Sequence, residues 1–102
     1  MLAHMVYFTL KDNSESSKQN LVSACKKYLS HQDGIVFFAV GTRAEVYQRP
    51  VNDKEFDVAL HLVFTDRAAH DSYQEHPDHL RFIAENKEGW KSVRVFDADA
   101  DR

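Results

Sequence analysis

The chain has 102 residues, of which 43% are hydrophobic and 28% charged, and its formal net charge is −3. These values predict one globular domain over residues 1–102 and exclude a membrane span, since no apolar run approaches ~20 residues. The acidic balance also argues against a nucleic acid partner, because binding to the phosphate backbone needs clustered Lys and Arg. A single cysteine, Cys25, excludes an internal disulfide and fits a reducing compartment, so we expect a cytoplasmic protein.

The first predicted elements are a strand over residues 2–10 and a helix that runs from the region of Ser14 to about residue 30. The strand carries apolar side chains on both of its alternating faces, so we expect both faces to be covered. The helix has one apolar stripe and a capping signal from Asp12 or Ser14 at its start. Gly34, which suits a left-handed turn, follows its end.

The middle of the chain predicts two strands joined by a polar loop. Residues 35–40 form a β-branched and aromatic run typical of a buried strand, which we expect to resume over residues 44–47. Residues 48–54 are rich in turn formers and predict a hairpin loop. Residues 56–65 alternate apolar side chains and predict the third strand, with His61 on the face opposite to the larger apolar residues.

The last third of the chain predicts two helices, a strand and a tail. The first helix begins at Asp66 and the second at Pro77, because proline is favoured in a first helical turn and disfavours helical geometry at His76 before it. Residues 90–96 predict the final strand. Residues 97–102 are polar and acidic, and we expect them to be frayed.

The resulting order is β-α-β-β-α-β, which is the plan of a ferredoxin-like α+β fold with a four-stranded antiparallel sheet and helices on one face. The other face of the sheet would expose Met5 and Tyr7 of the first strand. An open apolar face on so short a chain predicts a partner, and the simplest partner is a second copy related by a two-fold axis. We therefore expect a homodimer.

Tyr73 and two histidines lie within seven residues, around the predicted break between the two helices. A break of this kind can place polar side-chain tips beside a small cavity. The residues expected at this cavity as catalytic or ligand-binding groups are His4, Val6, Phe8, Tyr73, His76, His79 and Phe82. Structural roles remain open for three of them: His4 could bond to backbone, His76 could cap a helix, and Tyr73 could be a core residue.

Three stretches together resemble the stress-responsive A/B barrel (Dabb) family, and the resemblance covers nearly the whole chain. They are residues 4–12, residues 57–64 and the segment Tyr73-x-x-His76-Pro77-x-His79-x-x-Phe82. The resemblance implies a ferredoxin-like fold whose sheets pair into a dimeric α+β barrel. Most members of this family have no assigned reaction.

One plant member of the family closes the ring of a linear polyketide. The resemblance places its two catalytic histidines on His4 and His79, and a tyrosine of its catalytic pocket on Tyr73. Histidine can act as a general base near neutral pH, and a tyrosine hydroxyl can stabilise a developing enolate oxygen. The first helix and the loop between the second and third strands differ from that member, so the substrate does not follow from the resemblance.

Three functional hypotheses follow, and the sequence leaves open whether the protein is an enzyme. The first is a dimeric Dabb protein of unassigned role, with a pocket for a small apolar or aromatic molecule between sheet and helices. The second is a cofactor-free, polyketide-cyclase-like or other lyase that uses His4, Tyr73 and His79. The third is a haem- or oxygen-using α+β barrel protein with His76 or His79 as iron ligand. Nothing in the sequence requires a metal or another cofactor, so none is predicted.

Overall fold

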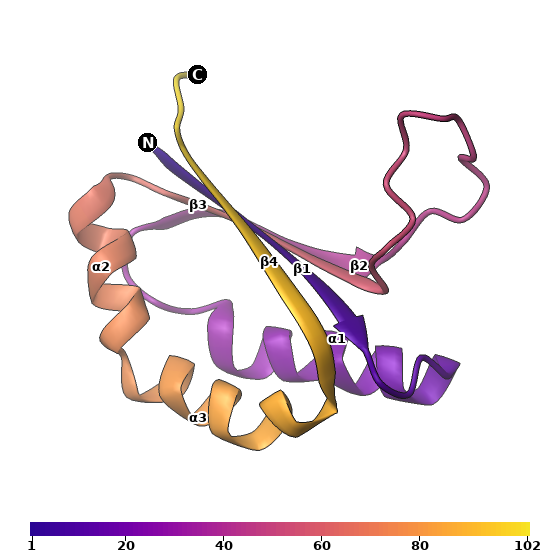
Figure 1. Cartoon of the computed structure of the whole chain (residues 1–102). Helices are drawn as coiled ribbons and strands as arrows, with labels where there is room; N and C mark the ends of the chain where they lie inside the picture. The colour runs from indigo at the N-terminus through magenta and orange to yellow at the C-terminus, as the bar shows by residue number, and fades with distance from the viewer.

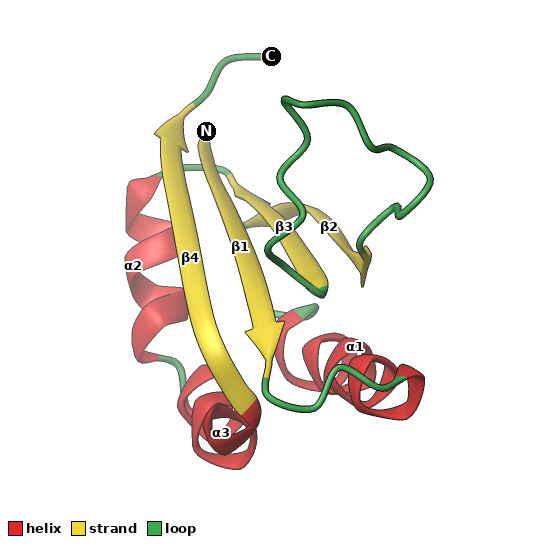
Figure 2. Ribbon diagram, turned by 45° about the vertical axis from the view of Figure 1, so that its right-hand side comes forward, coloured by secondary structure: helices red, strands yellow, loops and turns green.

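The sheet and the helices form two layers in the computed structural model, which describes residues 1–102 (Figure 1). The four strands are β1 (Leu2–Leu10), β2 (Ile35–Thr42), β3 (Val58–Phe64) and β4 (Trp90–Asp99). The helices are α1 (Glu15–Leu29), α2 (Arg67–Glu75) and α3 (Pro77–Asn86), followed by the short 3-10 helix η1 (Lys87–Gly89). All three α-helices lie on one face of the sheet, which leaves the other face open (Figure 2). None of the helices has the length and apolar character needed to span a membrane.

β1 lies in the interior of the sheet, whose strand order is β2-β3-β1-β4 with every neighbouring pair antiparallel. Residues directly opposite each other in an antiparallel pair point to the same face. His4 of β1 lies opposite Leu62 of β3 and opposite Asp97 of β4. The register alone therefore brings polar side chains from the first and the last strand together on the helix-facing side.

The hydrophobic core fills the space between the sheet and the helices. The helix-facing residues of β3 are at most 1% exposed, and they are Val58, Leu60, Leu62 and Phe64. The predicted apolar stripe of α1 is also buried, and it consists of Leu21, Val22, Cys25, Tyr28 and Leu29. Burial raises the pKa of the Cys25 thiol to about 12, so this cysteine acts as a core residue and not as a nucleophile.

Three local signals in the sequence have the predicted structural effect. Ser14 caps α1 by accepting a hydrogen bond from the backbone N–H of Ser17, and Asp66 caps α2 by accepting one from Ala69. Gly34 has a φ of 87°, a left-handed backbone conformation that residues with a Cβ rarely adopt. A Cβ at Gly34 would also collide with the Cβ of Ala69, so the turn before β2 and the start of α2 approach each other only because this residue is glycine.

The prediction that the second strand resumes over residues 44–47 is wrong. β2 ends at Thr42, whose partner Val58 is the first residue of β3. Residues 44–47 therefore have no strand beside them, and the N–H of Tyr47 instead donates to the carbonyl of Ala44 in a turn. The connection is a long loop over residues 43–57, which projects beyond the ends of β2 and β3 (Figure 1).

The prediction of a frayed tail from residue 97 is also wrong, since β4 continues to Asp99. β1 begins at Leu2, and the antiparallel register gives residues 97–99 direct partners on its first three residues. Two further contacts hold this end of the strand. The amine of Met1 donates to the carbonyl of Ala100, and Arg67 of α2 makes two hydrogen bonds to the Asp99 carboxylate.

Candidate functional site

A cavity of about 420 Å³ lies between the helix-facing side of the sheet and the helices α2 and α3. Ten of its fifteen lining residues are hydrophobic. The five polar lining residues are His4, His70, Gln74, His79 and Asp97. A mostly apolar hollow with a few converging polar groups is typical of a small-molecule site.

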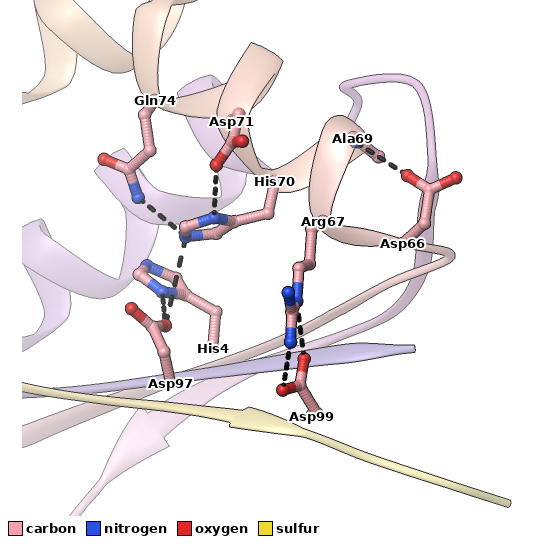
Figure 3. Close-up of polar contacts among 9 residues, drawn as sticks. All are labelled: His4, Asp66, Arg67, Ala69, His70, Asp71, Gln74, Asp97 and Asp99. Atoms are coloured by element: carbon pink, nitrogen blue, oxygen red, sulfur yellow. Dashed lines mark hydrogen bonds and ion pairs between the residues drawn. The ribbon is translucent and has the colours of Figure 1, made fainter.

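His4 and Asp97 form the most closely coupled polar pair in this cavity. The register places them opposite each other, and His4 Nδ1 lies 2.5 Å from Asp97 Oδ1 (Figure 3). Because a carboxylate can only accept, Nδ1 of the neutral imidazole donates and Nε2 keeps its lone pair. His4 is 4% exposed. Burial lowers its pKa, an effect that the neighbouring Asp97 carboxylate opposes only in part, so the imidazole is mainly neutral at pH 7.

His79 reaches the cavity from the first turn of α3 and packs against Tyr73 of α2, with ring centroids 4.6 Å apart. Its Nδ1 lies 3.1 Å from the carbonyl oxygen of Gln74, so this nitrogen donates and Nε2 again keeps its lone pair. Burial lowers the pKa of His79, and the nearby His4 and His70 lower it further, while the bond to Gln74 raises it in part.

Tyr73 packs near both histidines, since its ring centroid also lies 5.8 Å from that of His4. It is 2% exposed, and burial raises the pKa of its phenol above the ordinary value. The phenol therefore stays protonated near neutral pH. Its hydroxyl makes no hydrogen bond within the chain, so it is a free donor at the cavity.

Six of the seven residues predicted for this site line the same cavity, and they are His4, Val6, Phe8, Tyr73, His79 and Phe82. The structure places His76 elsewhere. Its backbone is extended before Pro77, and its Nδ1 accepts a hydrogen bond from the N–H of Asp78 at 3.0 Å, which caps α3. Of the two histidines considered as haem ligands, only His79 therefore faces the cavity.

Besides Gln74, sequence interpretation missed two polar residues of the site, His70 and Asp97. The His70 ring lies over that of His4, with centroids 4.9 Å apart, and its Nε2 is 3.9 Å from Asp97 Oδ1 (Figure 3). A signal existed for each. His70 precedes Tyr73 by three residues and so shares its helical face, and Asp97 continues the alternation of Val93 and Val95 along β4.

A second hollow, of about 500 Å³, lies on the open face of the sheet beside the 43–57 loop. Aromatic side chains line it together with Arg43 and Arg94. Arg94 is bound by two hydrogen bonds to the Asp53 carboxylate, at 2.7 and 3.0 Å, which ties the loop to β4. The hydrogen bonds from the Arg94 guanidinium lower the pKa of the Asp53 carboxyl to about 2. With its charges paired, this hollow offers no free base or nucleophile.

The strand order and the one-sided helices define a ferredoxin-like α+β domain, here with a cavity lined by histidines and a tyrosine. The chain belongs to the stress responsive A/B barrel domain (Dabb) family, whose sequence profile matches residues 2–100. The predicted family and the predicted fold are thus confirmed.

Solved structures agree with this assignment. A Dabb family protein with a ferredoxin-like fold from Mesorhizobium loti is 25% identical, with 99% of this chain and 97% of that chain covered and a TM-score of 0.80. A dimeric ferredoxin-like protein of unknown function from Thermobifida fusca is 16% identical, with 97% and 90% covered and a TM-score of 0.79. A hydroxynitrile lyase from Passiflora edulis is 16% identical, with 98% and 93% covered and a TM-score of 0.77. No curated protein sequence matches the chain. These comparisons assign no specific role.

Proposed function

We propose that this chain is a homodimeric Dabb protein whose helix-side cavity binds a small apolar or aromatic carbonyl compound. We further propose that His79 and His4 act there as cofactor-free proton acceptors, with Tyr73 as a hydrogen-bond donor. One observation carries the proposal. In both histidines Nδ1 already donates to a fixed acceptor, so each holds a basic Nε2 in an apolar cavity.

The chemistry that fits these groups is removal of a proton from a carbon next to a carbonyl. His79 Nε2 takes the proton, and the electron pair of the broken C–H bond moves into an enolate. The Tyr73 hydroxyl donates a hydrogen bond to the enolate oxygen, which carries the new negative charge. The enolate then takes back a proton or attacks a second carbonyl, as ring closure requires. His4, held by Asp97, supplies the second proton-transfer group.

The walls of the cavity support an apolar or aromatic ligand. Phe8, Phe82 and Trp90 form one aromatic wall, with ring centroids 5.0 to 6.2 Å apart. A volume of about 420 Å³ suits a small molecule. The Passiflora protein carries the name hydroxynitrile lyase, so the same fold serves a lyase elsewhere. At 16% identity that likeness concerns the fold alone, and it leaves the substrate of this chain open.

The open face of the sheet supports the homodimer. Phe37 of β2 is 54% exposed there, and Phe96 of β4, which is 55% exposed, lies beside Met5 and Tyr7. Large exposed rings on one face are typical of an interface. Several structural neighbours are described as dimeric. Two open faces packed across a two-fold axis would form a dimeric α+β barrel, with each helix-side cavity on the outside of the barrel.

Acetophenone, a small aromatic ketone, is a suitable probe for the cavity. Binding can be followed by the fluorescence of Trp90, the only tryptophan, which lies in the cavity wall. Catalysis can be followed by NMR as incorporation of deuterium into the ketone methyl group in D₂O. His79→Ala should slow this exchange by about 100-fold or more, which is typical for loss of a general base. Tyr73→Phe should slow it by about 100-fold.

His31→Ala is the matched control, because His31 is exposed and lies outside the cavity. It should exchange deuterium at the wild-type rate. The proposal is rejected if wild-type protein neither binds acetophenone nor accelerates its exchange. Equal exchange by the wild-type and His79→Ala proteins would also reject it, since the base would then lie elsewhere.

A further inference from the structure

Three metal-ligating side chains converge at the edge of the cavity, from three different elements. They are His4 of β1, His70 of α2 and Asp97 of β4 (Figure 3). One ligand atom of each lies within 4.8 Å of the other two. We propose that these residues form a binding site for a divalent transition-metal ion of the zinc type. Two imidazole nitrogens and one carboxylate oxygen favour such ions over Mg²⁺ or Ca²⁺, which prefer oxygen ligands alone.

The surroundings of His70 prepare its Nε2 as a ligand. The other ring nitrogen, Nδ1, lies 3.3 Å from Asp71 Oδ1 and donates to that carboxylate. Metal-binding histidines usually have such a partner, which fixes the tautomer and raises the basicity of the ligating nitrogen. The lone pair of Nε2 accepts from the Gln74 side-chain amide at 3.1 Å. A bound metal ion would displace the Gln74 amide and accept the lone pair of His70 Nε2 in its place.

The bond between His4 and Asp97 supplies the other two ligands. In the metal-free protein a proton lies between Nδ1 and Oδ1, which are 2.5 Å apart. A metal with ligands at about 2.0 to 2.1 Å would need these atoms about 3 Å apart, which is a small opening of the pair. Metal binding would then release the proton to solvent. The Asp97 side chain is 42% exposed, which gives an ion a path from solvent to the largely buried histidines.

Three protein ligands leave at least one coordination position for water or for a bound molecule. This inference goes beyond the proposed proton transfer. The two proposals share His4, but His79, the main proposed base, and Tyr73 are not ligands. The two can be tested separately on the same protein.

Co²⁺ is the probe, because its visible absorption reports the number and type of its ligands. Wild-type protein should bind one Co²⁺ per chain with about one proton released, measured by titration calorimetry in two buffers of different ionisation enthalpy. His70→Ala and Asp97→Asn should each weaken Co²⁺ binding by about 100-fold or more. Even the loss of a residue that only hydrogen-bonds to a metal ligand lowers metal affinity by about 10- to 100-fold. Asp71→Asn, which loses only such a partner, should weaken it by about 10-fold.

His31→Ala controls for adventitious binding by exposed histidines and should leave the affinity unchanged. His79→Ala should also leave Co²⁺ binding unchanged while it slows acetophenone exchange, so failure of one proposal is distinguishable from failure of the other. Circular dichroism confirms that each variant is folded, and His70→Gln replaces His70→Ala if the latter is not. The metal site is rejected if wild-type protein binds no Co²⁺, or if a folded His70 variant and Asp97→Asn bind it as tightly as wild type.

Discussion

The two faces of the sheet carry similar side chains in different surroundings. On the helix-facing side, His4 is buried and bonded to the Asp97 carboxylate at 2.5 Å. On the open side, His61 is half-buried, and its Nε2 lies 3.3 Å from the hydroxyl of Tyr7. Both histidines come from interior strands, and His61 lies directly opposite Met5, the residue after His4. A shift of one residue along a strand thus changes the face, and with it the chemistry.

The helices determine which face of the sheet can hold a reactive group. On the covered face, desolvation keeps His4 and His79 mainly neutral, and the fixed acceptors orient their rings. On the open face, aromatic residues such as Phe37 and Phe96 remain exposed and are available for association. The covered face therefore suits a catalytic group, and the open face suits association with a second chain. Substitutions on each face and a change of pH test this difference between the faces.

The largest effect is expected from neighbouring residues of β3 that point to opposite faces. Leu62 is fully buried under the helices, and Val63 is half-buried on the open side. Leu62→Ala should lower the free energy of unfolding by about 2 to 5 kcal/mol, because it leaves a cavity in a packed core. Val63→Ala should cost less than Leu62→Ala. Urea denaturation at one protein concentration measures both, and equal losses would contradict the assignment of the faces.

An intermediate effect is expected at the open face. Phe96→Asp places a charge among the exposed rings and removes a side chain whose full burial is worth about 1.5 to 3 kcal/mol in each chain. Sedimentation of the wild type should give twice the chain mass of 11.8 kDa, and that of the variant should give the monomer. Leu80→Asp is the control, because Leu80 is 54% exposed but lies on α3. A Phe96→Asp protein that stays dimeric would exclude this face as the interface.

The smallest effect is expected from pH on the covered face. Burial lowers the pKa of folded His79, the nearby His4 and His70 add to this, and the Gln74 carbonyl opposes it in part. The unfolded chain, with a His pKa of about 6.5, then binds the proton more readily than the folded chain does. The free energy of unfolding should therefore fall as the pH drops through about 6.5 towards the folded-state pKa.

His79→Gln removes this group and should make the loss of stability at acidic pH smaller. His31→Gln, at an exposed position, should behave like the wild type. Urea midpoints at about pH 7.5 and about pH 5.5, on either side of the ordinary histidine pKa, give the comparison. If the wild-type and His79→Gln proteins lose equal stability, His79 is not desolvated in the folded state.

The parts of the fold that were predictable from the sequence depend on local chemistry. Ser14, Asp66 and Gly34 act through their own backbone or residues close by, and Pro77 marks the break between α2 and α3. The alternation along β1 also gave the correct separation of its two faces. The break that Pro77 causes likewise predicted that Tyr73 and His79 lie at a cavity.

The parts that were missed depend on contacts between distant segments. The polar neighbours of Asp97 predict a frayed tail, whereas its order comes from pairing with β1. His70 follows two alanines on a helix with a polar outer side, and only the docking of α2 onto the sheet brings it to His4. Residues 44–47 have strand-like composition but no strand to pair with. Propensity cannot decide such cases, since the partner is absent from the local sequence.

The pairing of β1 with β4 also sets the order in which the protein can form. His4 and Asp97 are 93 residues apart in the chain, and their strands share the longest ladder in the sheet. Contacts at such separation form late, because a long loop must close first. During synthesis β1 is made well before its neighbour β4, which begins only at Trp90. The His4–Asp97 pair therefore cannot form until β4 has been made, and a nascent chain that ends before residue 90 contains three of the four strands but no such pair.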